Sequence, residues 1–290
     1  MPGAARLGRL RWVALAALSF FFLYRWTSSS DPSPPPQGSA DDPIPAEVYK
    51  RAREPDIDHS ILGIGRHSGT IIFIHGLGGS AEIALPLVGR LRPKLWQVSW
   101  VLPNSPHMAF TGMQGQKMSA WFDMDELPLP QGAPMPKRED EAHMQAAVTR
   151  VHGLIQAEID KGIDANRIVL AGFSQGCATT LLAGLSTKEK LGGLMCLSGW
   201  LPMAYKIQKS GSKETHPMQT SHAHEVPVFW GHGAADSVIQ YAWGEQSIAH
   251  LTKMGFSNIE FHTYPDLQHW VATEEEDDML AWFQKILPPT

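Results

Sequence analysis

Ser174 lies in Gly172-Phe-Ser-Gln-Gly176, a G-x-S-x-G pattern that is typical of a nucleophilic serine. The apolar run before it predicts a buried strand, and the small and apolar residues after it predict a helix. A sharp turn between the two leaves no room for a Cβ atom on either side of the serine, which explains the glycines. The start of the helix would direct free N–H groups and a positive dipole end toward an oxyanion near Ser174. A glycine-rich turn without catalytic meaning is the alternative.

A serine hydroxyl needs a base that removes its proton, and the base needs an acid that orients it. Asp236 and His269 each follow a predicted strand in the later part of the chain. Functional residues of open parallel sheets lie just past the carboxyl ends of strands. We therefore expect Asp236 to orient His269 and His269 to activate Ser174. Asp266 is the alternative acid.

An oxyanion hole requires two backbone donors where negative charge develops. The N–H of Gln175, directly after the candidate nucleophile, is one candidate. The glycine-rich turn Phe73-Ile-His-Gly-Leu-Gly78 follows another predicted strand, and the N–H of Leu77 is the second candidate.

For the other histidines and for the cysteines, we expect structural roles. His75 and His232 each precede a glycine after a strand and are expected to be structural hydrogen-bonding groups. Three further histidines have no acid or cysteine at a recognised ligand spacing: His216, His222 and His224. We therefore expect them to lie in a solvated loop and not in a metal site. Two cysteines cannot make a disulfide framework, and we expect both to be small buried hydrophobic residues: Cys177 and Cys196.

The elements that must position these residues alternate regularly from residue 70 onward. Apolar runs predict strands at 70–75, 97–102, 167–172, 193–198, 226–230 and 258–263. Three- and four-residue apolar spacing and turn signals predict helices at 81–92, 139–161, 175–186, 240–254 and 274–286. Thr273 and Glu276 predict a capping box at the start of the last helix. The alternation predicts an α/β fold, with a mostly parallel sheet and helices on both faces.

The chain has 290 residues and a formal net charge of −5, which suits one large catalytic domain and excludes a nucleic-acid partner. Residues 1–11 are basic, and residues 12–26 are apolar enough for a signal peptide or a short signal anchor. Residues 27–45 form a Pro/Ser-rich linker, and residues 46–290 the catalytic domain. We expect membrane association through residues 12–26, with a cytoplasmic enzyme as the alternative. The sequence specifies no oligomeric state.

The motifs beyond the serine pattern occur in order over about residues 68–287: Phe73-Ile-His-Gly-Leu-Gly78, Val101-Leu-Pro103, Met118-Ser-Ala-Trp-Phe-Asp123, Leu197-Ser-Gly-Trp-Leu-Pro202, Gly231-His-Gly233 with Asp236, and His269. Together they resemble the acyl-protein thioesterase and lysophospholipase-like carboxylesterase family of α/β-hydrolases. The resemblance implies a triad of Ser174, Asp236 and His269, and an oxyanion hole at Leu77 and Gln175. It also implies cleavage of protein thioesters, lysophospholipids or short esters without a cofactor.

The sequence departs from that family in several segments. Gly79 stands where many members carry an acid, residues 126–136 are rich in proline, and residues 205–224 form an extended loop. We expect both segments to lie near the acyl site. Apolar side chains before them predict an acyl pocket, with ordinary core packing as the alternative: Met108, Phe110, Met113, Met118, Trp121 and Phe122.

Three functions follow. The first is a serine hydrolase that removes fatty acyl groups from S-acylated (palmitoylated) proteins through an acyl-enzyme. The second uses the same residues as a lysophospholipase or general carboxylesterase. The third is a membrane-tethered, non-catalytic scaffold with a hydrolase fold.

Overall fold

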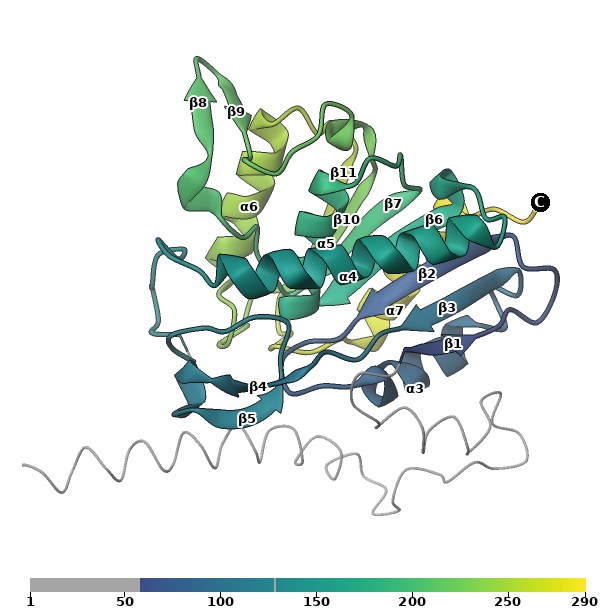
Figure 1. Cartoon of the computed structure of the whole chain (residues 1–290), viewed down its shortest axis with the longest axis horizontal. Coiled ribbons are helices and arrows are strands. Elements are labelled where there is room, and N and C mark those ends of the chain that lie inside the picture. The colour runs from purple at the N-terminus through teal and green to yellow at the C-terminus, as the bar shows by residue number, and fades with distance from the viewer. Residues whose placement is uncertain (1–57, 128) are drawn as a thin grey trace, which may run out of the picture. The chain divides into compact units, whose positions relative to one another are not determined.

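The computed structural model describes residues 58–127 and 129–290, which build one central sheet with helices on both faces (Figure 1). The sheet is seven-stranded, in the order β1-β3-β2-β6-β7-β10-β11. Its strands are β1 (His59–Ile61), β2 (Gly69–Ile74), β3 (Val98–Leu102), β6 (Ile168–Phe173), β7 (Gly193–Leu197), β10 (Val228–Gly233) and β11 (Ile259–Tyr264). Only β1 is antiparallel to its neighbour, β3.

In the described part of the chain, five long helices cover the two faces of the sheet. They are α3 (Ala81–Leu91), α4 (Glu141–Asp160), α5 (Gln175–Ser186), α6 (Tyr241–Lys253) and α7 (Thr273–Ile286). Helices α4, α5 and α6 share one apolar core with alternate side chains of the strands, including Ile72, Leu170 and Trp230. On the other face, α7 packs Trp282 against Phe229 of β10 and Phe283 against Trp100 of β3. The predicted doubly covered, mostly parallel sheet is confirmed.

The register explains why the polar residues gather at one edge. Strands β2, β6, β7, β10 and β11 run parallel, and their buried residues are almost wholly apolar. Parallel strands buried on both faces require such continuous apolar runs. Their carboxyl ends lead into the turns that carry His75, Ser174, Asp236 and His269.

The sequence did not predict the short strands. Besides β1, two hairpins are present: β4 (His107–Phe110) with β5 (Gln116–Ser119), and β8 (Gln208–Ser210) with β9 (Lys213–Thr215). The second hairpin projects beside α6 (Figure 1) and occupies the segment predicted as an extended loop. In the described part of the chain, no helix is long and apolar enough to cross a bilayer. The expectations for residues 1–11, 12–26 and 27–45 lie outside the described residues.

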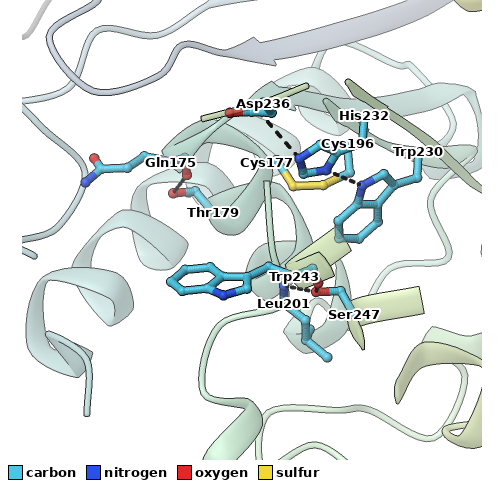
Figure 2. The surroundings of a disulfide bond; sticks show 10 residues. All are labelled: Gln175, Cys177, Thr179, Cys196, Leu201, Trp230, His232, Asp236, Trp243 and Ser247. Carbon is cyan, nitrogen blue, oxygen red and sulfur yellow. Dashed lines mark hydrogen bonds and ion pairs between the residues drawn. A yellow bond between two sulfur atoms is a disulfide. The ribbon is translucent and has the colours of Figure 1, made fainter. Parts of the chain in front are cut away.

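Two local predictions are wrong. Cys177 and Cys196 are buried as expected, but they are joined as a disulfide between α5 and β7 (Figure 2), because their Cα atoms lie only 4.6 Å apart. The capping box of α7 does not form: the N-cap is Ala272, without a side-chain capping bond. The carboxylate of Glu276 instead accepts two hydrogen bonds from the guanidinium of Arg90 in α3, at 2.7 and 2.5 Å.

Candidate active site

Ser174 occupies the turn between β6 and α5 in a conformation that non-glycine residues seldom adopt, with φ 56° and ψ −118°. The turn is closed from both sides. A Cβ at Gly172 would overlap the carbonyl oxygen of Gly176, and a Cβ at Gly176 would overlap the carbonyl oxygen of Ile74. The Ser174 side chain makes no capping bond to α5, so its hydroxyl is not used by the helix. This is the geometry of a nucleophile elbow.

The structure brings Asp236 and His269 together. His269 Nδ1 donates to Asp236 Oδ2 at 2.7 Å, so the other ring nitrogen, Nε2, is the one left to act on a substrate or a hydroxyl. The imidazole also packs on the ring of Phe173, the residue before Ser174, with ring centroids 4.7 Å apart. The alternative acid, Asp266, is exposed.

Asp236 remains ionised although it is buried. Its Oδ1 accepts from the backbone N–H groups of Val238 and Ile239, at 2.8 and 2.9 Å. Burial alone would raise the pKa of Asp236. The charge of His269 and the hydrogen bonds from His232 and His269 outweigh burial and hold that pKa far below its ordinary value. The carboxylate can therefore orient His269 and stabilise the imidazolium form.

The two predicted oxyanion donors lie in turns with free N–H groups. Gln175 is the first residue of α5, and the N–H groups of a helical first turn have no partner within the helix. In the other turn, Gly78 N–H donates to Ser119 O at 2.8 Å and Gly79 N–H donates to Gly76 O at 3.1 Å. Leu77 N–H has no backbone partner among the described residues. Both N–H groups are therefore available to a developing oxyanion.

The Gln175 side chain has a further role that the serine pattern did not indicate. Its Oε1 accepts from Trp121 N–H at 3.1 Å, and its Nε2 donates to Phe122 O at 3.0 Å. The indole N–H of Trp121 in turn donates to His75 O at 2.7 Å. These bonds join the segment after β5 to both turns that carry the oxyanion donors. The sequence marked that segment by the motif around Trp121 and as a candidate wall of the acyl pocket, but it did not indicate these hydrogen bonds.

His75 is a structural hydrogen-bonding group, as predicted. Its Nδ1 donates to Gly76 O at 2.7 Å, and its Nε2 accepts from Ser105 N–H at 3.1 Å. Burial lowers the pKa of His75 to about 4. The hydrogen bond to Gly76 opposes this shift, and the charge of Arg150 adds to it. A neutral imidazole therefore holds the turn before Leu77.

A cavity of about 720 Å³ beside Phe122 is the candidate acyl pocket, and its lining does not include Ser174, His269, Leu77 or Gln175. Of the side chains that the sequence proposed for it, Met108 and Phe122 line the cavity. Trp121 is buried against the ring of His75, with centroids 5.2 Å apart, and it is not among the lining residues; neither are Met113, Met118 and the buried Phe110. Much of the remaining apolar lining comes from the proline-rich segment and from two tryptophans of later elements, including Leu129, Pro130, Pro134, Trp200 and Trp243, and charged side chains such as Asp123, Lys137 and Arg138 also line the cavity.

A carboxylate that sequence reasoning missed holds one wall of this cavity. Glu139 Oε1 accepts from the indole N–H of Trp200 at 3.0 Å, and its Oε2 accepts from Met203 N–H. Burial raises the pKa of Glu139, while these two hydrogen bonds lower it. Trp200 contacts Phe122 and Trp243 edge-on, with centroids 5.9 Å apart in both pairs. The cavity thus has a rigid aromatic wall.

One histidine of the group predicted to form a solvated loop is buried. His216 Nε2 donates to Pro202 O at 2.9 Å, which fastens the β8–β9 region to the loop after β7. His222 and His224 are half-buried. Outside this group, His262 of β11 stacks on Phe229 with ring centroids 4.7 Å apart.

Comparison with known proteins gives consistent matches. Residues 60–287 match the model of the Phospholipase/Carboxylesterase family. Acyl-protein thioesterase 1 of Cryptococcus neoformans is 37% identical over 233 residues, covering 76% of this chain and 93% of that protein. Acyl-protein thioesterase 1 of Neurospora crassa is 36% identical, covering 82% and 94%.

Solved plant structures have the same fold. Arabidopsis thaliana SOBER1 superposes with a TM-score of 0.66 at 30% identity, covering 77% of this chain and 100% of that one. Zea mays acyl-protein thioesterase 2 gives a TM-score of 0.65 at 28% identity, covering 80% and 99%.

Proposed function

The chain belongs to the phospholipase/carboxylesterase family and is a serine hydrolase, and we propose that it cleaves fatty-acyl thioesters of S-acylated proteins with Ser174, His269 and Asp236 as its catalytic residues. The observation that carries the proposal is the 2.7 Å contact between His269 and Asp236, together with a serine on a closed elbow. The names of the thioesterase relatives support the substrate class.

In the acylation step, Ser174 Oγ attacks the acyl carbonyl carbon while His269 Nε2 takes the hydroxyl proton. The oxyanion of the tetrahedral intermediate accepts hydrogen bonds from Leu77 N–H and Gln175 N–H. The intermediate then collapses, the C–S bond breaks, and the His269 imidazolium returns the proton to the leaving thiolate. Asp236 stabilises the imidazolium without taking a proton.

In the deacylation step, His269 removes a proton from water, and the resulting nucleophile attacks the acyl-Ser174 carbonyl. The same two N–H groups stabilise the second oxyanion. Collapse of this intermediate breaks the bond to Ser174 Oγ, which regains a proton from His269, and the fatty acid leaves. Each oxyanion donor is expected to contribute about 3–4 kcal/mol to transition-state stabilisation.

The aromatic and proline wall of the cavity supports a long acyl chain as substrate. Each methylene group removed from water contributes about 0.8 kcal/mol. Trp200 and Trp243 are therefore expected to set the preferred chain length. A Trp243→Ala variant should shift the preference among acyl thioesters toward longer chains, measured as kcat/KM for a chain-length series.

The test of the function is turnover of a palmitoyl-thioester peptide by the purified chain, beside Ser174→Ala and a lysophospholipid substrate. The thioester should be hydrolysed by the wild-type chain and not by Ser174→Ala. A fluorophosphonate should label the wild-type serine. Absence of both labelling and turnover would favour the non-catalytic scaffold.

An ester substrate outside the cytosol is the second candidate, and the buried Cys177–Cys196 disulfide favours it. Disulfides persist in oxidising compartments. The basic residues 1–11 before the apolar residues 12–26 would also send the domain across a membrane and hold it there. Protease protection of a C-terminally tagged chain in sealed membranes separates the two: a protected tag supports a lysophospholipid or carboxylic ester, and a digested tag supports cytosolic thioesters.

A further inference from the structure

His232 is a fully buried imidazole beside Asp236 that has no part in the steps above. Its Nε2 lies 2.9 Å from the carbonyl oxygen of Ile239 and 3.5 Å from Asp236 Oδ2. Figure 2 shows the ring between Asp236 and Trp230, on the side of the disulfide. Because a carbonyl oxygen only accepts hydrogen bonds, the proton of this ring is on Nε2, and it faces both acceptors.

The other ring nitrogen fixes the same tautomer. The indole N–H of Trp230 can only donate, and it lies 3.5 Å from His232 Nδ1, which is therefore an unprotonated acceptor. Tyr241 of α6 meets the imidazole edge-on, with centroids 5.7 Å apart. Gly244 of α6 leaves the space that the ring needs: a Cβ there would lie 2.7 Å from His232 Nδ1. The ring can neither flip nor tilt freely.

His232 is thus bound to the carboxylate and to the turn that holds the carboxylate. The Ile239 residue whose carbonyl accepts from His232 also donates its N–H to Asp236 Oδ1. Asp236 Oδ2 accepts a hydrogen bond from His269 Nδ1 at 2.7 Å, and the N–H of His232 Nε2, which donates to Ile239 O, lies 3.5 Å from the same oxygen. Loss of His232 would free the turn and leave Oδ2 with one side-chain donor.

We propose that His232 is a positioning residue for the reaction: it holds Asp236 Oδ2 in the orientation that aligns His269 for Ser174. The inference rests on the proposed triad and adds a residue that acts through Asp236. No proton passes through His232, which keeps its Nε2 proton throughout. The titratable and charged groups that face it are Asp236 from its own turn, His269 beyond Asp236, and Tyr241 from α6.

The main test compares His232→Leu with His232→Gln, whose amide nitrogen can replace Nε2 as the donor. We expect His232→Leu to lower kcat/KM for the thioester about 10-fold, because the N–H beside Asp236 Oδ2 and the hydrogen bond to the turn at Ile239 are both lost, and His232→Gln to recover most of it. With one donor fewer, Oδ2 interacts more strongly with the imidazolium form of His269. The acid limb of the kcat/KM profile should therefore move to higher pH in His232→Leu.

A double-mutant cycle separates this inference from the proposed function. In an Asp236→Asn background, the His232→Leu change should have no further effect, because the carboxylate on which it acts is absent. If Asp236→Asn alone is fully active, the proposed triad fails. If Asp236→Asn is inactive but His232→Leu matches wild type in rate and pH profile, the triad stands and the role of His232 is refuted.

Gly244→Ala provides the test if His232→Leu does not fold. The new methyl group displaces the imidazole while every hydrogen-bonding group remains. Its matched control is Gly153→Ala, on the exposed side of α4, where a Cβ would meet nothing within 4 Å. Gly244→Ala should reproduce the shift of the acid limb, and Gly153→Ala should not. A folded Gly244→Ala with the wild-type profile would also refute the proposal.

Discussion

Two buried carboxyl groups lie beside the same strand, β10, and one is ionised while the other is neutral. Asp236 follows the end of β10 and is held ionised by His269 and His232 and by two backbone N–H groups. Glu275 of α7 lies fully buried against Gly231 in the middle of β10. Burial raises the pKa of Glu275 to about 8, and the negative charges of Asp278 and Glu276 add to the effect.

The difference teaches that burial does not decide the charge of a carboxylate by itself. Desolvation raises the pKa of both groups, and the sign of the neighbouring charges together with the hydrogen-bond donors at the oxygens decides whether the charged form survives. At neutral pH the chain therefore holds one buried carboxylate as an anion for chemistry and another as a neutral acid for packing.

The largest expected effect comes from removing the charge of Asp236. Asp236→Asn should lower kcat/KM for the thioester by about 10⁴, as in other triads, because the amide no longer stabilises the imidazolium. Steady-state kinetics measure it. Glu275→Gln is the matched control and should retain activity within about twofold, since Glu275 contacts no group of the site. Equal losses of activity in both variants would contradict a special catalytic role for the charge of Asp236.

The next effect is on stability. Glu275 titrates near 4.5 when unfolded and near 8 when folded, so between those values the folded chain binds more protons. Stability should then fall as pH rises through this window, by at most about 1.4 kcal/mol per pH unit from this group. Glu275→Gln should flatten that slope and raise the free energy of unfolding near pH 8. Urea unfolding at several pH values measures both.

The exposed neighbour Glu274 supplies the control for that experiment. Glu274→Gln makes the same chemical change in the same turn of α7, and it should leave the slope as in wild type. If both variants change the slope equally, the effect belongs to the net charge of the turn and not to the buried carboxyl of Glu275.

His75 should produce a pH dependence of the opposite sign. Its pKa is about 4 in the folded chain and 6.5 when unfolded, so the unfolded chain binds more protons between these values. Stability from this group is complete above about pH 6.5 and is lost as pH falls toward 4. His75→Gln should reduce the slope of unfolding free energy between about pH 4.5 and 6.5. The exposed His107→Gln is the control, and an unchanged slope in His75→Gln would contradict the assignment.

The smallest effect is expected at Glu276, whose partner is a guanidinium on a neighbouring helix. The Arg90 side chain is 55% exposed, so solvent screens this pair. Arg90→Ala should cost less than about 1 kcal/mol in thermal or urea unfolding. A loss as large as the gain from Glu275→Gln would mean that the acidic turn of α7 depends on this cation.

Local sequence patterns predicted the central strands and the long helices, because continuous apolar runs and helical periodicity are local signals. The three-residue β1 is too short to have a period, and its neighbour β3 determines its pairing. Thr273 matches a capping box by spacing, but Glu276 lies close enough to Arg90 for a stronger partner. At this helix end, the tertiary contact outweighs the local capping preference.

The candidate site likewise has features that local patterns predict and features that depend on tertiary packing. The serine elbow has a local signature, and the positions of Asp236 and His269 after strands follow from the topology of parallel sheets. The support of Trp200 by Glu139 joins residues 61 apart in the sequence, and no local spacing indicates it. His232 lies only four residues before Asp236, but the packing of α6 against its ring, which the local sequence does not show, holds it beside the carboxylate. The pairing of Cys177 with Cys196 likewise depends on how closely α5 packs against β7.

The Cys177–Cys196 bond closes a covalent ring over a sequence separation of 19, and this ring contains α5 and the exposed turn with Lys188 and Lys190. A trypsin cut in that turn would break the backbone and yet release nothing. The two fragments would migrate as a single band on a non-reducing gel and separate only after dithiothreitol is added. The cleaved chain would thus keep Ser174, directly before α5, covalently linked to β7.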